Sequence, residues 1–126
     1  MSIFTHVCVG ANDIAQATAF YDAVLAPLGI KQVGNFGPEC INYGREQFEF
    51  LVLKPRDGQP ASSANGGTIG FVAPDKAAVE AFHAAGLANG GTDEGEPGPR
   101  FDGAAYAAYM RDPTGNKICA YVFSAS

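Results

Sequence analysis

The order strand, helix, then further strands occurs twice along this chain of 126 residues. A repeat of about half the chain length indicates two copies of one supersecondary unit, each too small to bury its own apolar sheet face. Pairing the copies would build a common core, with each helix covering the outer face of its sheet. We therefore expect an α+β fold in which two βαβββ modules form a cupped mixed sheet.

The first copy is expected in residues 1–55. Apolar positions recur at helical intervals from Ile14 to Leu28, after an Asn12-Asp13 cap, and Gly29 follows where a helix would end. Apolar alternation and Gly- or Pro-containing breaks predict the strands around this helix. These strands are expected at residues 3–9, 31–35, 39–43 and 47–54.

The second copy is expected in residues 66–126, after a Gly-, Ser- and Pro-rich linker at 56–65. Asp75 would cap a helix that ends at Gly90-Gly91. Strands are predicted at residues 68–73, 104–111 and 117–123, with the turn Asp112-Pro113-Thr114-Gly115 between the last two. The Gly- and Pro-rich segment before Arg100 is too irregular to be predicted as a strand.

Charge and cysteine content narrow the partners and the compartment. Eight basic and thirteen acidic side chains give a net charge of −5, which repels nucleic acid and anionic lipid. No apolar run is long enough to span a bilayer, and the first residues lack a basic region and a cleavable apolar segment. Three cysteines without a CxxC pair argue against disulfides and structural zinc. Neither nucleic acid nor membrane is expected as a partner, and the expected location is cytoplasmic.

Strand alternation predicts which side chains line the concave side of the sheet. The first copy would contribute Phe4, His6 and Cys8 from its first strand, and Gln47, Glu49, Leu51 and Leu53 from its fourth. The second copy would contribute Thr68, Gly70, Lys117, Cys119, Tyr121 and Phe123.

Four motifs resemble the vicinal oxygen chelate superfamily of glyoxalases, bleomycin resistance proteins and extradiol dioxygenases. They are a first strand carrying His6, a helix with Asp13, Ala17, Phe20 and Tyr21, a strand opening from Gly66 to Phe71, and the hairpin Arg111 to Lys117. The hairpin RDPTGNK is the most specific of them. The resemblance covers nearly the whole chain and implies the same two-module fold.

In metal-using members of this family, ligands project into the concave side from the strands that begin and end each module. The resemblance places His6 and Glu49 at two ligand positions, as ligands or as general bases. Thr68 stands where the family usually has His, and Cys119 stands where it usually has Glu. A zinc site from His6, Glu49 and Cys119 is chemically consistent with nitrogen, oxygen and sulfur donors. An inert buried thiol is the favoured interpretation of Cys119.

Other polar residues have structural interpretations beside functional ones. Arg100 lies in a loop that the family places near the mouth of the concave side, where it could pair with a ligand carboxylate or phosphate; a solvated loop charge is the alternative. A satisfied half-buried histidine and a structural ion pair are the alternatives for His6 and Glu49. His83, in the second helix, is assigned no role and is expected at the surface or at an interface.

Three functions stay open from the sequence. The favoured one is a metal-free protein that binds a small organic ligand through Phe4, Leu51, Thr68, Arg100, Tyr121 and Phe123. The second is a metal-dependent lyase, isomerase or dioxygenase, similar to lactoylglutathione lyase, in which His6 and Glu49 hold zinc, nickel or iron. The third is a metal-free enzyme with His6 or Glu49 as base. A homodimer is expected from the resemblance and from the prevalence of two-fold dimers.

Overall fold

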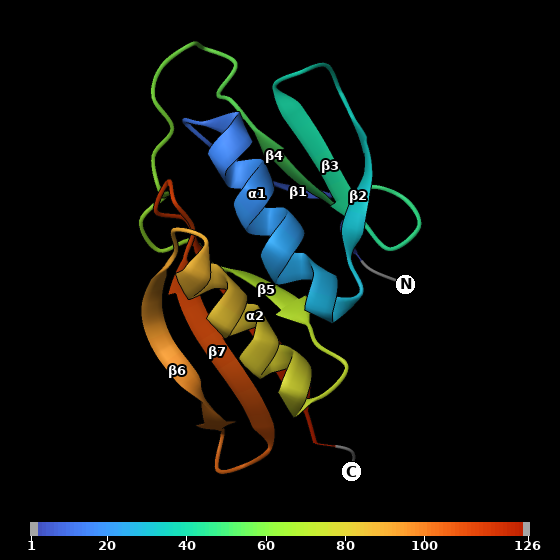
Figure 1. Ribbon diagram of the computed structural model, residues 1–126, viewed down its shortest axis with the longest axis vertical. Helices are drawn as coiled ribbons and strands as arrows, with labels where there is room; N and C mark the ends of the chain where they lie inside the picture. The colour runs from blue at the N-terminus through green and yellow to red at the C-terminus, as the bar shows by residue number, and fades with distance from the viewer. Residues whose placement is uncertain (1–2, 125–126) are drawn as a thin grey trace.

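The computed structural model describes residues 3–124 and shows eight strands with two α-helices and one 3₁₀ turn (Figure 1). The elements in chain order are β1 Val7–Gly10, α1 Ile14–Leu25, η1 Ala26–Leu28, β2 Lys31–Asn35, β3 Cys40–Gly44, β4 Phe50–Leu53, β5 Ile69–Val72, α2 Lys76–Ala88, β6 Thr92–Arg100, β7 Ala105–Arg111 and β8 Lys117–Phe123.

The strands form two four-stranded mixed sheets with the same internal order, which confirms the expected fold class. The first sheet runs β1-β4-β3-β2 and the second runs β5-β8-β7-β6. In each sheet the first and last strands of the copy pair in parallel, and the other pairs are antiparallel. We call β1 to β4 with α1 and η1 the N-terminal half, and β5 to β8 with α2 the C-terminal half.

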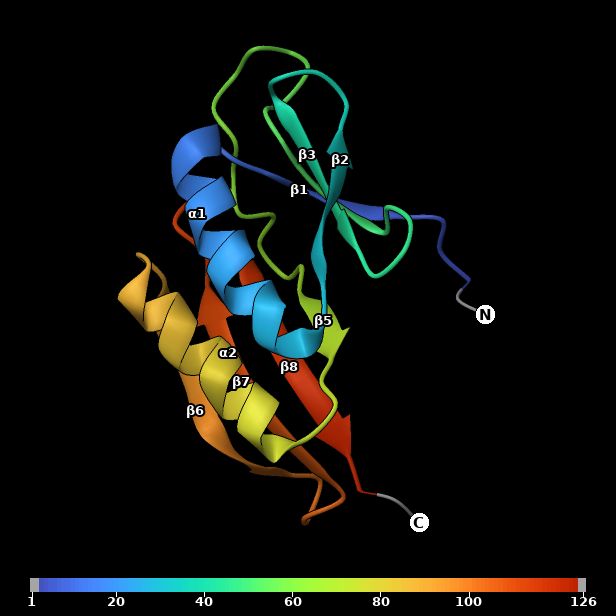
Figure 2. The same ribbon diagram turned by 45° about the vertical axis from the view of Figure 1, so that its right-hand side comes forward.

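Both helices lie on the same side of the sheets, as Figures 1 and 2 show. The Asp13 carboxylate accepts the Gln16 amide at 3.0 Å and starts α1, and Asp75 accepts the Ala78 amide at 2.8 Å and starts α2. Pro27 lies in the 3₁₀ turn after α1, and Gly29 ends that turn in the left-handed conformation at φ +78°. The capping signals of both helices are thereby confirmed.

One apolar core fills the space between helices and sheets. Phe20, Val24 and Leu25 of α1 are fully buried, as are Val79 and Phe82 of α2. Aromatic rings continue this core from one half to the other. The rings of Phe50, in β4, and Phe71, in β5, meet edge to face with their centroids 5.1 Å apart.

The first strand is shorter than predicted. β1 begins at Val7, and Ile3 and Phe4 are exposed over 90% and 64% of their surfaces. β1 pairs in parallel with β4, and their register starts at Val7 and Phe50, so the residues before Val7 lie outside the strand pairing. The β4 prediction was also too long, since residues 45–47 bend before that strand begins.

The C-terminal half contains a strand that the sequence did not reveal. β6 covers nine residues and pairs with β7 over its whole length. Its register shifts twice, between Asp93 and Gly95 and between Gly95 and Gly98. These irregularities at the edge of the sheet explain why Gly and Pro are tolerated there and why no alternation was visible.

His83 lies in the core side of α2 rather than at the surface. Its ring is 6% exposed, and Nε2 lies 2.8 Å from a carboxylate oxygen of Asp93 at the start of β6. The expectation of a surface histidine was therefore wrong. The unpredicted β6 strand supplies the partner that allows this imidazole to be buried.

Candidate functional site

The sheet face opposite the helices carries most of the predicted site residues, and we call it the helix-free face. In β1 and β4, Val9 and Val52 point into the core, so Cys8 and Leu51 point to the helix-free face. In β8, Ile118 and Ala120 belong to the core, so Cys119 and Tyr121 point to this face. Alternation predicted these assignments correctly.

The N-terminal half has a cavity of about 560 Å³ on this face, the N-terminal cavity. It contains two of the predicted residues, His6 and Leu51. Its lining is His6, Cys8, Phe36, Glu39, Cys40, Phe48, Leu51, Leu53, Lys54, Pro55, Arg56 and Gly58. Aromatic and aliphatic walls with a few polar groups are typical of small-molecule sites.

His6 is an exposed side chain at the rim of this cavity, just before β1. Its Nδ1 atom lies 3.0 Å from the Thr5 hydroxyl, and its ring meets the edge of Phe48 at a centroid distance of 5.6 Å. Phe48 in turn meets Phe36 at 5.3 Å. The imidazole is thus open to solvent or a ligand, and Phe48, itself packed on Phe36, contacts its ring.

Glu49 is exposed and does not line the N-terminal cavity. Its amide donates to the Tyr43 carbonyl at 2.9 Å, and its carbonyl accepts the Val7 amide at 3.0 Å. Together with Phe4, it lines a separate hollow of about 280 Å³ between the two halves. The main chain at Glu49 therefore continues the sheet, while the side chain faces a different opening from His6.

Thr68 lies in a third position, also between the halves. It is exposed and lines a small hollow of about 140 Å³ together with Cys8 and Lys117. Five of the predicted residues, His6, Leu51, Glu49, Phe4 and Thr68, are thus distributed over three separate openings in one chain.

Cys119 is almost fully buried in β8, with 3% of its surface exposed. A Cβ atom on Gly70, in the neighbouring strand, would lie 3.3 Å from its sulfur, so the glycine leaves room for the thiol. Burial raises the pKa of the Cys119 thiol, although Tyr109 and Lys117 act in the opposite direction. A protonated, shielded thiol is a poor ligand and a poor nucleophile.

The remaining predicted residues gather on the helix-free face of the C-terminal half. Tyr121 stacks on Phe123 at 5.5 Å and on Phe101 at 6.2 Å, and its hydroxyl contacts the hydroxyl of Tyr109. We call Phe101, Tyr109, Tyr121 and Phe123 the aromatic platform. Sequence reasoning did not assign Phe101 to the site, because its place depends on the turn between β6 and the next strand.

Arg100 folds back along β6 instead of extending into solvent. Its guanidinium donates to the carbonyls of Glu96, Gly98 and Pro99. Its carbon Cζ also lies 5.8 Å from the centre of the Tyr109 ring. The side chain is half-buried and held by these bonds, so it is not the solvated loop charge that was the structural alternative.

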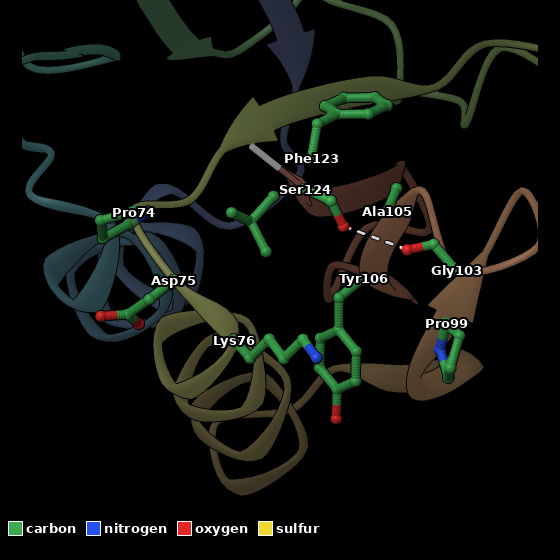
Figure 3. Close-up of a pocket in the computed structure, with 10 residues that line it drawn as sticks. Pro74, Asp75, Lys76, Pro99, Gly103, Ala105, Tyr106, Phe123 and Ser124 are labelled. Atoms are coloured by element: carbon green, nitrogen blue, oxygen red, sulfur yellow. Dashed lines mark hydrogen bonds between the residues drawn. The ribbon is translucent and has the colours of Figure 1, made fainter. Parts of the chain in front are cut away.

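A further cavity of about 340 Å³ lies on the helix side of the C-terminal half (Figure 3). Lys76 extends along one wall, with its ammonium 5.4 Å from the centre of the Tyr106 ring, and Ser124 donates to the Gly103 carbonyl at 3.1 Å. Of the predicted site residues it contains only Phe123.

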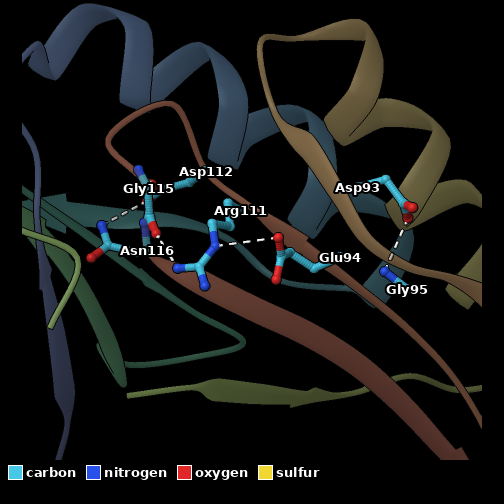
Figure 4. A network of polar contacts seen from close by, with 7 residues as sticks. All are labelled: Asp93, Glu94, Gly95, Arg111, Asp112, Gly115 and Asn116. Carbon is cyan, nitrogen blue, oxygen red and sulfur yellow. Dashed lines mark hydrogen bonds and ion pairs between the residues drawn. The ribbon is translucent and has the colours of Figure 1, made fainter. Parts of the chain in front are cut away.

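The hairpin between β7 and β8 forms a compact polar network (Figure 4). One carboxylate oxygen of Asp112 accepts the amides of Thr114, Gly115 and Asn116 at 2.9–3.0 Å. Arg111 donates to the Gly115 carbonyl at 2.8 Å and pairs with Glu94 at 3.5 Å. The Asp-Pro-x-Gly-Asn motif therefore closes a turn rather than pointing a reactive group into a cavity.

The predicted metal-ligand set is not brought together within one chain. Across residues 3–124, no three His, Cys, Asp or Glu side chains lie close enough to hold one ion. His6, Glu49 and Cys119 occupy a cavity rim, a separate hollow and a buried strand position. Within the described part of one chain, these three side chains therefore do not form a site for a divalent metal. In the same part of the chain, no helix is long and apolar enough to cross a membrane.

Comparison with known proteins identifies the family. Residues 3–120 match the Glyoxalase/Bleomycin resistance protein/Dioxygenase superfamily. A glyoxalase/bleomycin resistance protein from Albidiferax ferrireducens is 48% identical over 95% of this chain and 98% of that one, with a TM-score of 0.86. Lactoylglutathione lyase from Agrobacterium tumefaciens is 25% identical over 96% and 93% of the two chains, with a TM-score of 0.65.

A glyoxalase-related enzyme from Fulvimarina pelagi shares the fold at 17% identity, with a TM-score of 0.74 over 96% of this chain and 88% of that one. No curated protein matches the sequence significantly. The sequence match over 118 positions and the paired four-stranded sheets show that this chain belongs to the glyoxalase/bleomycin resistance protein/dioxygenase superfamily.

Proposed function

We propose that this chain binds a small organic molecule on its helix-free face without requiring a metal ion. The observation that carries the proposal is the N-terminal cavity of about 560 Å³, which falls within the usual size range of ligand pockets. Phe36, Phe48 and Leu51 give it an apolar lining, and His6 gives it an accessible hydrogen-bonding group. The dispersed ligand set described above supports binding without a metal.

The proposed working unit is a homodimer of single-domain chains. The predicted ligand residues lie apart in one chain, with His6 and Leu51 in the N-terminal half and Arg100, Tyr121 and Phe123 in the C-terminal half. A two-fold axis that places the N-terminal half of one chain against the C-terminal half of its partner would bring these residues around one ligand. Exposed apolar side chains at Ile3 and Val72, which lie outside the aromatic platform, provide a surface that such an arrangement would cover.

The proposal is tested with 2-naphthol, a planar fluorescent probe that is neutral at pH 7. Fluorescence anisotropy should show saturable binding to the purified chain. Phe48→Ala removes an aromatic wall that is 37% exposed and should weaken binding roughly fivefold, the value of one aromatic contact. Leu87→Ala, at an α2 position that is 45% exposed, is the matched control and should leave binding unchanged. Absence of binding, or equal binding by both variants, contradicts the proposal.

The second candidate is a metal-dependent lyase, isomerase or dioxygenase that uses His6 and Glu49. The observation in its favour is that these residues immediately precede Val7 and Phe50, the first paired residues of two neighbouring parallel strands. The identity to lactoylglutathione lyase also supports it. Turnover of the methylglyoxal–glutathione adduct, lost in both His6→Ala and Glu49→Gln, would establish this function instead.

A further inference from the structure

The C-terminal half presents an aromatic surface beside two cations that no carboxylate neutralises. Phe101 and Phe123 are exposed over 66% and 64% of their surfaces, and both stack on Tyr121. Lys117 and Arg100 lie 5.4 and 5.8 Å from the centre of the Tyr109 ring. None of the ion pairs formed among residues 3–124 involves either cation.

The charge near the platform differs from the charge of the whole protein. The chain carries a net charge of −5, yet Arg100 bonds only to carbonyl oxygens there, so its positive charge is retained. The nearby Glu94 is paired with Arg111 at 3.5 Å. Arg100 and Lys117 are therefore the positive charges that the anionic group of a ligand would meet beside the platform.

The turn before the next strand adds an independent observation. Phe101 and Asp102 both adopt φ +53°, a left-handed conformation that is unfavourable for a phenylalanine. Gly103, which tolerates this conformation, follows only two positions after Phe101. Strain of this kind persists where the placement of a side chain matters. Here the conformation brings the Phe101 ring onto Tyr121, while two thirds of the ring surface remains open to solvent.

We propose that the aromatic platform binds a planar aromatic anion, such as an aryl carboxylate. The ring of the ligand stacks on Phe101, Tyr121 and Phe123, and its anionic group lies toward Lys117 and Arg100. This inference rests on the proposed function, because Arg100, Tyr121 and Phe123 belong to the ligand site proposed above, and it narrows the ligand to one chemical class.

The first test compares 2-naphthoate with 2-naphthol, which have the same ring system and differ in charge at pH 7. Naphthoate should bind about two- to fivefold more tightly, the range of one exposed charge pair. Adding NaCl should remove that difference and leave naphthol binding unchanged. Equal binding of the two probes overturns the inference while the proposed function stands; if neither probe binds, both fail.

The second test removes a cation with a matched control. Lys117→Met should lower naphthoate affinity to the level of naphthol. Lys76 also lies 5.4 Å from a tyrosine ring, that of Tyr106, but on the helix side, so Lys76→Met should leave both affinities unchanged. Equal effects of the two variants would show that only the overall charge matters and would overturn the inference.

The third test separates binding from packing at Phe101. Phe101→Gly relieves the left-handed strain, so the melting temperature should be maintained or raised while naphthoate binding falls roughly fivefold. Ala64→Gly relieves the same kind of strain in the linker, at φ +49°, and should leave binding unchanged. A lower melting temperature in Phe101→Gly would mean that the ring serves packing. Loss of a dimer in light scattering would mean that a second copy covers the platform; either result overturns the inference.

Discussion

The hydroxyl of Tyr21, in α1, donates a 2.6 Å hydrogen bond to the carboxylate of Asp112, which lies 91 positions later in the turn between β7 and β8. Both side chains are buried. Burial, and then the neighbouring carboxylate, hold the pKa of Tyr21 well above its usual range, so the phenol keeps its proton. Asn116 donates both to the same carboxylate oxygen and to the carbonyl of Gly10, at 2.9 and 2.8 Å. The family hairpin therefore joins the C-terminal half to the N-terminal half.

Tyr21→Phe should lower the free energy of unfolding by about 1.5–3 kcal/mol, because it removes a buried hydrogen bond to a charged group. Tyr43→Phe is the matched control. Tyr43 is equally buried but donates at 2.9 Å to Asp22, an exposed carboxylate that water can solvate, so its loss should cost less than about 1 kcal/mol. Urea denaturation measures both variants. Equal losses of unfolding free energy in the two variants would contradict a stabilising role for the Tyr21–Asp112 contact beyond that of an exposed hydrogen bond.

The two halves should unfold together, since one core and the Tyr21–Asp112 bond connect them. We expect coincident transitions in urea by far-ultraviolet circular dichroism and by tyrosine fluorescence, as for a single domain. Two separated transitions would show that residues 1–55 and 66–126 are independent domains.

The His83–Asp93 pair should make the free energy of unfolding depend on pH in the acid range. The hydrogen bond from His83 lowers the pKa of Asp93 below its ordinary value. The stability that the pair contributes is therefore fully present above the ordinary carboxyl pKa and is lost as the pH falls through the lowered value. His83→Gln should move the Asp93 pKa back toward its ordinary range, as followed by NMR titration of the carboxyl carbon. An unchanged titration would show that the amide of Gly95, which also donates to Asp93, sets the pKa alone.

The three thiols should differ in reactivity toward a disulfide reagent at pH 8. Desolvation raises the pKa of all three thiols, so access decides the difference: Cys8 is exposed and Cys40 is half-buried, whereas Cys119 is buried. The thiols of Cys8 and Cys40 should react in the native protein, and that of Cys119 only on unfolding. Cys119→Ser should remove that slow phase. Fast reaction of Cys119 would restore it as a candidate nucleophile or metal ligand.

Protein purified without added metal should contain far less than one equivalent of zinc, nickel or iron per chain and should not turn over the methylglyoxal–glutathione adduct. Only His6 and Glu49 match the family ligands, and a hard cation held by two protein donors would be largely water-ligated and weak. Elemental analysis measures the metal. One equivalent that is lost in His6→Ala would support the metalloenzyme alternative.

Light scattering at micromolar concentration should give the mass of two chains. The physical reason is the exposed apolar surface at Ile3 and Val72, together with the separation of the predicted ligand residues in one chain. The mass of one chain at that concentration would contradict the homodimer.

Much of the fold was predictable because its signals are local. Helical spacing and the caps Asp13, Gly29 and Asp75 depend on residues a few positions apart, and the structure confirms each of them. The strand β6 was not predictable, because its two bulges interrupt the alternation that marks a strand. The burial of His83 followed from β6 and was missed with it.

The candidate site was only partly predictable, because it depends on contacts between distant segments. Alternation assigned Leu51, Cys119 and Tyr121 to the correct sheet face. It could not show that Arg100 folds back onto Tyr109, or that the turn after β6 brings Phe101 onto Tyr121.

The amino-acid sequence by itself determined the element order apart from β6, the two-fold repeat and the family, because periodicity, caps and the RDPTGNK hairpin are encoded within short windows. Tertiary structure alone decided that His6, Glu49 and Thr68 open onto three separate hollows and that Cys119 is enclosed. The physical reason is that a side chain's surroundings depend on where its strand ends and on which segment packs against it. In this protein both are set by pairing across tens of residues.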